Sequence, residues 1–527
     1  MLRGKLQSKL APGLTITLAG DAMFDRATQS YYTPVNQPDG IPNTGNPTNP
    51  DLTWSSTLPY NRTTSYGGSG TVQWEINRQF TIKSVTAYRG LHGPIYYDND
   101  GVTAIKGDSL AQFWQHQFTQ ELNLNGEFDH WNFVAGLYYF SEGFHNHRLS
   151  QSAGAPVDNV GTVTHTNNWL STTAWALFGQ ANIHLTDRLT ATVGGRWTTE
   201  LRKFRNIGQT GRSWGLHDPQ EWNYDPDAFF VKYPTGTSAS SSLTSFDVTA
   251  APKRFSRFTP KLGLQYDWNK AIFQYVSWSQ GFKSGGYDLR SVTAIGSDTP
   301  YLPQITTTYE TGLKTRLFGG KATFNLAAYY NDIADFQVRA TSTAALGVVT
   351  NQLINAGKAA SWGGEAELTL APTDNLTITG SAAYLKTKYR TFTATLPANV
   401  AGRSTLVGLD FPYAPRWQFG ASVNYRVPVD LPGALRIGGD VQYESSRYAD
   451  LYNTAQLQVR SQTYVNGTIN FAADKGNWSI GASVRNLFDL RRAQFGGYSP
   501  TNAGQYPYYY LAYNEPRTFN ITLSKNF

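Results

Sequence analysis

The end of the chain alternates apolar and polar side chains, and this pattern constrains the fold more than any other feature of the sequence. From Pro516 onward the apolar positions are Phe519, Ile521 and Leu523, with Phe527 as the terminal side chain. Polar residues stand between them, and Lys525 is the single break. Because successive side chains of a strand point to opposite faces, the segment has one apolar face and one polar face. Any half-buried strand would fit this pattern, so its repetition elsewhere decides the fold.

The same alternation recurs in pairs of segments joined by tight turns, for example at 11–13 and 77–79. The expected pairs are 2–9 with 14–24, 70–78 with 80–89, 112–125 with 129–143, 169–184 with 188–203, 255–267 with 271–282, 306–317 with 321–334, 362–371 with 375–389, 416–427 with 434–446, and 463–473 with 477–489. The strand at 516–527 follows without a partner. The sequence therefore predicts about 19 strands.

Connections between successive pairs are often much longer than the turns within a pair, as at 25–66, 204–254 and 391–412. Outer-membrane barrels have this asymmetry, with short periplasmic turns and long extracellular loops. Strands of ten or more residues also suit a tilted crossing of a bilayer, whereas strands of soluble proteins centre on five or six residues. These features favour a transmembrane antiparallel β-barrel.

The direction of the charged side chains supports a barrel with a wet interior. Within 309–317, Tyr309 and Leu313 alternate with Glu310 and Lys314. The same alternation sets Glu365 and Glu367 in 364–370, and Asp440 in 435–443, opposite apolar residues. A charge on the lipid face near mid-bilayer costs about 2–4 kcal/mol, so we expect these charges to line the lumen. The mean hydropathy of −0.41 does not contradict this, because the two faces cancel in any hydropathy window. A large soluble all-β protein, the alternative, leaves charged rows opposite apolar rows unexplained.

Composition excludes several other classes of protein. The chain has no cysteine, which rules out a disulfide scaffold, thiolate metal sites and a thiol nucleophile. Its net charge of +7 is spread along the chain without a basic block, so a nucleic-acid partner is not expected. Aromatic residues reach 14%. Those at 138–140 and 329–330, and Tyr425, suit the aromatic girdles that flank a membrane.

Three short motifs resemble chemical sites but lack the context that such sites need. The GxSxG stretch around Ser213 lies in a polar segment without the helix that a nucleophile elbow requires. His145 and His147 are spaced to hold a metal, but no third ligand is evident nearby. The segment 98–101 resembles the start of a calcium loop, yet Val102 stands where an acceptor is needed. We therefore expect no catalytic residues, no metal site and no cofactor.

Aromatic residues of the long loops are the best candidates for ligand contact, because they offer large, stiff and amphipathic faces. Packing within the loops or anchoring at the interface is the alternative role for each of them. The candidates are Trp54, Tyr60, Tyr96, Tyr97, Trp214, Trp222, Tyr224, Tyr508, Tyr509 and Tyr510.

A series of short motifs runs along nearly the whole chain in a fixed order. They are FTQEL at 118–122, GLYYF at 136–140, GRW at 195–197, GFKSGGY at 281–287, YETGLK at 309–314, NAGK at 355–358, GEAE at 364–367, NLFD at 486–489 and PRTF at 516–519. Each motif is weak alone, but the ordered set resembles the β-barrel domain of TonB-dependent outer-membrane receptors.

This resemblance implies a 22-strand receptor barrel in the outer membrane of a Gram-negative bacterium, of which about 19 strands are present. It also implies a signal peptide, a TonB-contacting box and a plug domain, none of which is recognisable here. We therefore expect residues 1–527 to be a single, N-terminally truncated barrel domain. The implied partners are lipid and lipopolysaccharide, the barrel-assembly machinery through the strand ending at Phe527, and TonB–ExbB–ExbD for a full-length receptor.

The implied function is active uptake of a scarce, bulky nutrient without covalent chemistry. A ferric siderophore is expected first, and cobalamin, an oligosaccharide or an aromatic compound next. A passive porin-like channel and a non-functional receptor fragment are the alternatives. An outer-membrane lipase or protease, and an adhesin or phage-docking scaffold, are weaker alternatives.

Overall fold

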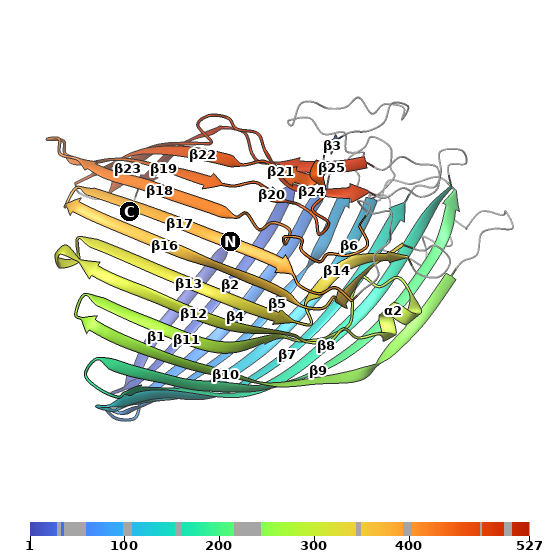
Figure 1. Cartoon of the computed structure of the whole chain (residues 1–527), viewed down its shortest axis with the longest axis horizontal. Helices are drawn as coiled ribbons and strands as arrows, with labels where there is room; N and C mark the ends of the chain where they lie inside the picture. The colour runs from blue at the N-terminus through green and yellow to red at the C-terminus, as the bar shows by residue number, and fades with distance from the viewer. Residues whose placement is uncertain are drawn as a thin grey trace.

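The computed structural model describes residues 1–28, 33–35, 59–98, 108–152, 160–214, 244–343, 349–393, 403–474, 477–499 and 508–525. It is nearly all β. Nineteen strands form one antiparallel sheet that curves into a barrel, with short turns gathered at one end (Figure 1). Among the described residues, no helix combines the length and apolar character needed to cross a membrane.

The barrel strands pair in chain order. They are β1 (Leu2–Ala11), β2 (Leu14–Thr28), β4 (Tyr60–Glu75), β5 (Phe80–Asp98), β6 (Asp108–Glu127), β7 (Trp131–Ser152), β8 (Val160–His184), β9 (Leu189–Trp214), β10 (Thr244–Asn269), β11 (Ile272–Lys283), β12 (Gln304–Leu317), β13 (Ala322–Ala334), β16 (Ala359–Thr373), β17 (Leu376–Tyr389), β18 (Trp417–Val427), β19 (Gly433–Glu444), β22 (Gln462–Ala473), β23 (Trp478–Arg485) and β26 (Thr518–Lys525). The number of strands and their pairing into hairpins confirm the sequence prediction.

The strands β4 to β10 are longer than predicted, at 16 to 26 residues. The predicted loop at 204–254, for example, is partly strand, because β9 continues to Trp214 and β10 begins at Thr244. Beyond a bilayer both faces of a strand can be polar, so the alternation that marks a membrane-spanning segment is lost there. The sequence pattern therefore located the membrane portion of each strand and missed its outward extension.

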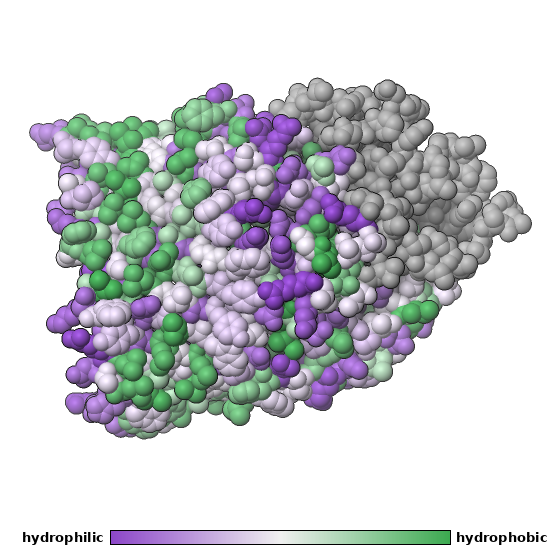
Figure 2. All heavy atoms as spheres, viewed as in Figure 1, coloured by the Kyte–Doolittle hydropathy of each residue, from purple (hydrophilic) through white to green (hydrophobic). Residues whose placement is uncertain are grey.

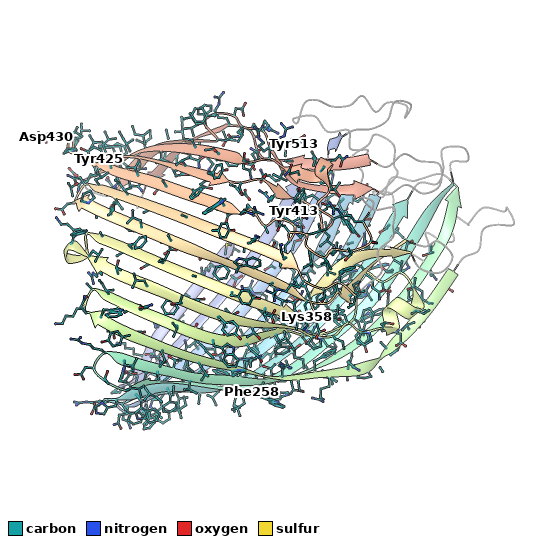
Figure 3. All side chains as sticks on the ribbon, viewed as in Figure 1. Phe258, Lys358, Tyr413, Tyr425, Asp430 and Tyr513 are labelled. Atoms are coloured by element: carbon teal, nitrogen blue, oxygen red, sulfur yellow. The ribbon has the colours of Figure 1, made fainter. Side chains whose placement is uncertain are left out.

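Aromatic side chains on the outer wall form two girdles. Two outward-facing aromatic residues on β4, Tyr66 and Trp74, are eight residues apart. The same spacing separates the outward-facing Trp417 and Tyr425 on β18. Eight residues span about 26 Å along a strand, or about 20 Å across the membrane at a tilt of about 40°, which is close to the apolar band of about 25 Å in an outer-membrane barrel. Tyr425 lies at the short-turn end, near Asp430 (Figure 3).

The girdle nearer the loop end, which includes Tyr66 and Trp417, is here called the outer girdle. It contains contacts between aromatic rings on neighbouring strands. Tyr139 lies 4.4 Å from Trp175 between ring centroids, and Tyr384 lies 4.6 Å from Trp417. Of the aromatic residues predicted for the girdles, Tyr139, Tyr330 and Tyr425 face outward. Tyr138, Phe140 and Tyr329 are one position out of phase and face the lumen, so the prediction was wrong for these three. Hydrophobic residues gather over the part of the visible wall nearest the short turns (Figure 2).

The turns at the short end are tight, and the first one depends on a glycine. Gly13 has a φ of +77° between β1 and β2. A Cβ atom at this position would lie 2.6 Å from the carbonyl oxygen of Glu75 on β4. Only glycine fits both the backbone conformation and the close approach.

The edge strands of the sheet are β1 and β26, and no ladder joins them within the described part of the chain. Both strands run toward the short-turn end, since β1 leads into the turn at 12–13 and β26 pairs antiparallel with β23. A fully antiparallel closure between them therefore needs an odd number of intervening strands.

Smaller elements cover the loop end. They are β3 (Thr33–Val35), α2 (Ala294–Asp298), β14 (Gln337–Thr343), β15 (Val349–Asn355), β20 (Arg447–Tyr448), η4 (Ala455–Leu457), β21 (Gln458–Val459), β24 (Ala493–Ser499) and β25 (Tyr508–Tyr513). The short helix η2 (Phe318–Gly320) lies instead at the short-turn end, between β12 and β13. β3 follows the second barrel strand, and β24 and β25 precede the last one, yet the three form one sheet. Apolar clusters such as Tyr389 with Leu406 and Ile333 also lie at this end.

Candidate functional site

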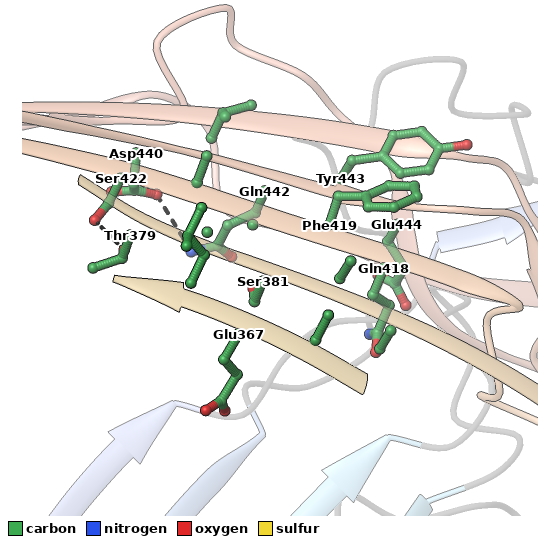
Figure 4. Close-up of a pocket in the computed structure, with 18 of the residues that line it drawn as sticks. Glu367, Thr379, Ser381, Gln418, Phe419, Ser422, Asp440, Gln442, Tyr443 and Glu444 are labelled. Carbon is green, nitrogen blue, oxygen red and sulfur yellow. Dashed lines mark hydrogen bonds between the residues drawn. The ribbon is translucent and has the colours of Figure 1, made fainter. Parts of the chain in front are cut away.

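An open hollow of about 790 Å³ lies on the lumen wall (Figure 4). It lies over β16, β17, β18 and β19, and Gln462 and Tyr464 of β22 and Gln494 of β24 complete its lining. Its side chains are the lumen-facing members of the strand alternation, so hydroxyl, amide and carboxylate groups line it. The sheet positions these groups because every second residue of each strand must face inward.

Part of this wall is fixed by hydrogen bonds between strands. Asn466 donates through Nδ2 to Asp440 Oδ2 at 2.8 Å. Gln462 donates through Nε2 to Glu444 Oε2 at 2.6 Å, and Glu444 also pairs with Arg447. Thr379 and Ser422 are joined through their hydroxyls at 2.7 Å. These contacts hold the acidic groups of β19 in place.

Glu365 and Glu367 on β16 differ from the two acidic residues of β19. Both are exposed to the lumen, and within the described residues neither forms an ion pair. They therefore present negative charge and hydrogen-bond acceptors to whatever fills or crosses the barrel. Such a surface can bind and orient a polar solute.

A segment of the chain lies across the inner face of the wall near the loop end. Residues 284–302, here called the inner strap, connect β11 to β12 and include α2. The strap is held by buried amides of the wall: Asn168 donates to Leu289 O at 3.0 Å, and Asn206 donates to Ser291 O at 2.9 Å. Tyr287 stacks on Phe204 with ring centroids 5.5 Å apart.

One buried carboxylate ties the strap to the β14–β15 hairpin. Asp288, whose side chain is 2% exposed, accepts two hydrogen bonds from the Arg339 guanidinium, at 2.9 and 3.0 Å. It also accepts the backbone N–H groups of Leu353 at 2.8 Å and of Arg290 at 3.0 Å. Partial burial within the strap lowers the pKa of Arg290 and raises that of Tyr301. The strap is therefore a fixed part of the lumen.

The aromatic residues predicted to contact ligand are not brought together at this cavity. Tyr96 is 1% exposed and packs with Leu110, Leu149 and Val163, while Tyr60 lies beside it at 5.7 Å between ring centroids. Arg148 lies over the ring of Tyr97 at 5.8 Å.

For four more of the candidates the structure describes only the backbone. Trp214 ends β9, and Tyr508 and Tyr509 begin β25, where Tyr510 follows. Trp54, Trp222 and Tyr224 lie outside the described residues. The ligand-contacting role of the outer-loop aromatics stays a prediction.

The motifs set aside from the sequence have structural explanations where they are described. Ser213 lies within β9, paired with Gly161, which is not the strand-to-helix turn of a nucleophile elbow. Of the segment 98–101, only Asp98 is described, at the end of β5. His145 does not pair with His147, since its ring stacks between Trp114 and Trp169.

Sequence reasoning placed Glu365, Glu367 and Asp440 on the lumen side but did not identify them as a site. Gln462, Tyr464 and Gln494 were missed altogether. Gln494 stands in β24, which is not one of the barrel strands, and only the tertiary structure places it beside Gln462 of β22. No local pattern carries that information.

Comparisons with known proteins agree with this architecture. The family model described as "TonB dependent receptor-like, beta-barrel" matches residues 10–487. Similar solved structures include the ferric yersiniabactin uptake receptor FyuA from Yersinia pestis, at 18% identity and a TM-score of 0.73, covering 98% of this chain and 68% of that one. The siderophore receptor PiuA from Acinetobacter baumannii matches at 15% identity and a TM-score of 0.70, covering 99% and 73%. The ferric-catecholate import receptor Fiu from E. coli K12, in its closed form, matches at 14% and 0.68, covering 100% and 74%.

Proposed function

We propose that this chain forms the wall of a receptor for energised uptake of a ferric siderophore. The proposal starts from the family, since the chain belongs to the TonB-dependent receptor-like β-barrel family. Barrels of this family are outer-membrane proteins of Gram-negative bacteria, and they are receptors and transporters, not enzymes. The chain is therefore an outer-membrane barrel of that kind. The ferric siderophore is the specific part of the proposal.

The polarity of the lumen wall supports this proposal. Its wall is polar and bears Glu365 and Glu367 exposed to the interior, and the inner strap is tied to the wall near the loop end. A polar wall of this kind suits a hydrophilic solute that makes many weak hydrogen bonds along its way. The similar structures named above are receptors for ferric siderophores, which supports that class of ligand over cobalamin, an oligosaccharide or an aromatic compound.

Equilibrium binding tests the choice of ligand. The purified barrel in detergent would be titrated with ferric hydroxamate, catecholate and citrate complexes, with the same chelators free of iron, and with cobalamin and maltohexaose. We expect one class of ferric complex to bind at least tenfold more tightly than its iron-free chelator. Binding of cobalamin or the oligosaccharide alone, or of none of the probes, would contradict the proposal.

The same proposal extends to partners. Family membership implies a TonB-dependent interaction. Lipopolysaccharide is proposed to contact the outer wall above the outer girdle, where Lys203 and Trp114 are exposed. The barrel-assembly machinery is proposed to recognise β26, whose outward side chains Phe519, Ile521 and Leu523 are more than 70% exposed. Deleting these three side chains should block assembly in cells while leaving refolding in detergent possible.

A further inference from the structure

Two histidines on neighbouring strands bring their ring nitrogens together near the loop end of the barrel. His165 on β8 pairs in register with Leu149 on β7, so it lies diagonally opposite His147, on the same face of the sheet. His147 Nε2 lies 2.5 Å from His165 Nε2. The two rings are nearly perpendicular, at 69°, with centroids 4.6 Å apart.

This pair lies outside the bilayer. Trp175 marks the outer girdle on β8, and His165 stands ten residues further toward the loops. An apolar cluster of Tyr96, Leu110, Leu149 and Val163 lies on the same face of the sheet. His165 itself is 4% exposed, so a charged group here would be poorly solvated.

The two facing ring nitrogens decide what the pair can bind. A neutral imidazole carries a proton on one ring nitrogen and a lone pair on the other, and the lone pair is what binds a metal. Two nitrogen lone pairs facing each other at this distance repel, unless a proton or a cation lies between them.

Imidazole nitrogen is a good ligand for Zn²⁺, Cu²⁺ and Ni²⁺. Two nitrogens on one tetrahedral ion are about 3.3 Å apart, so the rings need to part by less than about 1 Å to admit it. Gln209, the register partner of His165 on β9, lies beside the pair, and its buried amide oxygen accepts no hydrogen bond within the described part of the chain. The surrounding apolar cluster would restrict access of water to a bound ion.

We propose that His147 and His165 form a binding site for a divalent transition-metal ion on the outer part of the barrel wall, with Gln209 or water completing the coordination. Within the described ranges no His, Asp or Glu side chain joins the pair to make a group of three, so the remaining ligands would be neutral oxygens. The bound ion would link β7 to β8 beyond the bilayer. This site is independent of the siderophore proposed above.

The test is metal binding by the purified, folded barrel. Zn²⁺ would be titrated calorimetrically, and Cu²⁺ would be followed by electron paramagnetic resonance. We expect one site per chain, with the spectrum of two coordinated nitrogens. His147→Ala and His165→Ala should each weaken Zn²⁺ binding at least tenfold and remove the two-nitrogen spectrum.

Two histidines that lie apart from the pair serve as matched controls. His145→Ala, two residues along the same strand, and His184→Ala, at the short-turn end, should leave both signals unchanged. His147→Gln and His165→Gln keep the size of the side chains and replace the alanine variants if those fail to fold, as judged by heat-modifiable migration in gels. Absence of Zn²⁺ binding by the natural chain, or unchanged binding in the folded double variant, would overturn the proposal.

Discussion

The inner strap depends on one buried ion pair, and removing it should free the strap without unfolding the barrel. Asp288→Ala deletes a carboxylate that is 2% exposed and accepts four hydrogen bonds, two of them from Arg339. Breaking a buried pair on one side costs about 3–5 kcal/mol. Arg339 is 29% exposed, so water can hydrate its guanidinium once Asp288 is removed. The free energy that holds the strap in place should therefore fall by about 3 kcal/mol, near the lower end of that range.

Hydrogen exchange measures this loss locally. At about 1.4 kcal/mol per factor of ten, the expected loss of about 3 kcal/mol raises the opening equilibrium of the strap by roughly a hundredfold. The faster exchange should appear at the amides of residues 284–302 and at Leu353, whereas β9 and β10 should keep their protection. The exposed pair of Arg205 and Asp247 offers the control, since Asp247→Ala should change exchange nowhere in the strap.

Equal exchange rates for the strap in Asp288→Ala and in the natural chain would refute the assignment of the ion pair as its anchor. So would a loss of protection spread over the whole barrel, because the strap would then be part of the global fold. Arg339→Ala leaves the Asp288 charge buried and should therefore loosen the strap at least as much.

Three further predictions concern the wall. Val441→Lys places a charge on the lipid face and should lower the free energy of unfolding by about 2–4 kcal/mol, measured by urea unfolding from lipid vesicles. The next residue faces the lumen, so Gln442→Lys should change that free energy little. Equal losses in the two variants would contradict the assignment of faces. Gly13→Ala should destabilise the barrel by about 1–2 kcal/mol through its positive φ, while Gly4→Ala, where no atom lies within 4 Å of an added Cβ, should not. Replacing Glu365 and Glu367 together by Gln should shift the reversal potential of the barrel in planar bilayers toward lower cation preference, and an unchanged potential would show that these carboxylates do not face the conducting path.

The membrane-spanning part of the fold could be predicted from the sequence because it obeys a simple physical rule. Where lipid lies on one side and water on the other, every second residue must be apolar, and segments such as 435–443 show that alternation directly. The outer halves of β7 to β10 have water or protein on both sides, and no rule of that kind marks them. Their length appears only in the structure.

The lumen site was predicted only in part, for a related reason. The inward direction of Glu365 and Glu367 followed from the alternation. The position of Gln494, in contrast, depends on β24, which is not one of the barrel strands. The same holds for Asp288, which lies in a segment without periodicity and finds Arg339 51 residues away. The pairing of His147 with His165 instead of His145 depends on strand register, which the sequence leaves open.

If the sheet is a membrane barrel, the odd-numbered residues of β19 face lipid and its even-numbered residues face a water-filled lumen. Because the chain has no cysteine, single cysteines introduced from Leu435 to Tyr443 can each carry a spin label without background. Accessibility to oxygen should peak at 435, 437, 439, 441 and 443, and accessibility to a water-soluble nickel chelate should peak at the positions between them. Odd positions closed to both reagents, as in a sheet buried between two protein layers, would contradict the account.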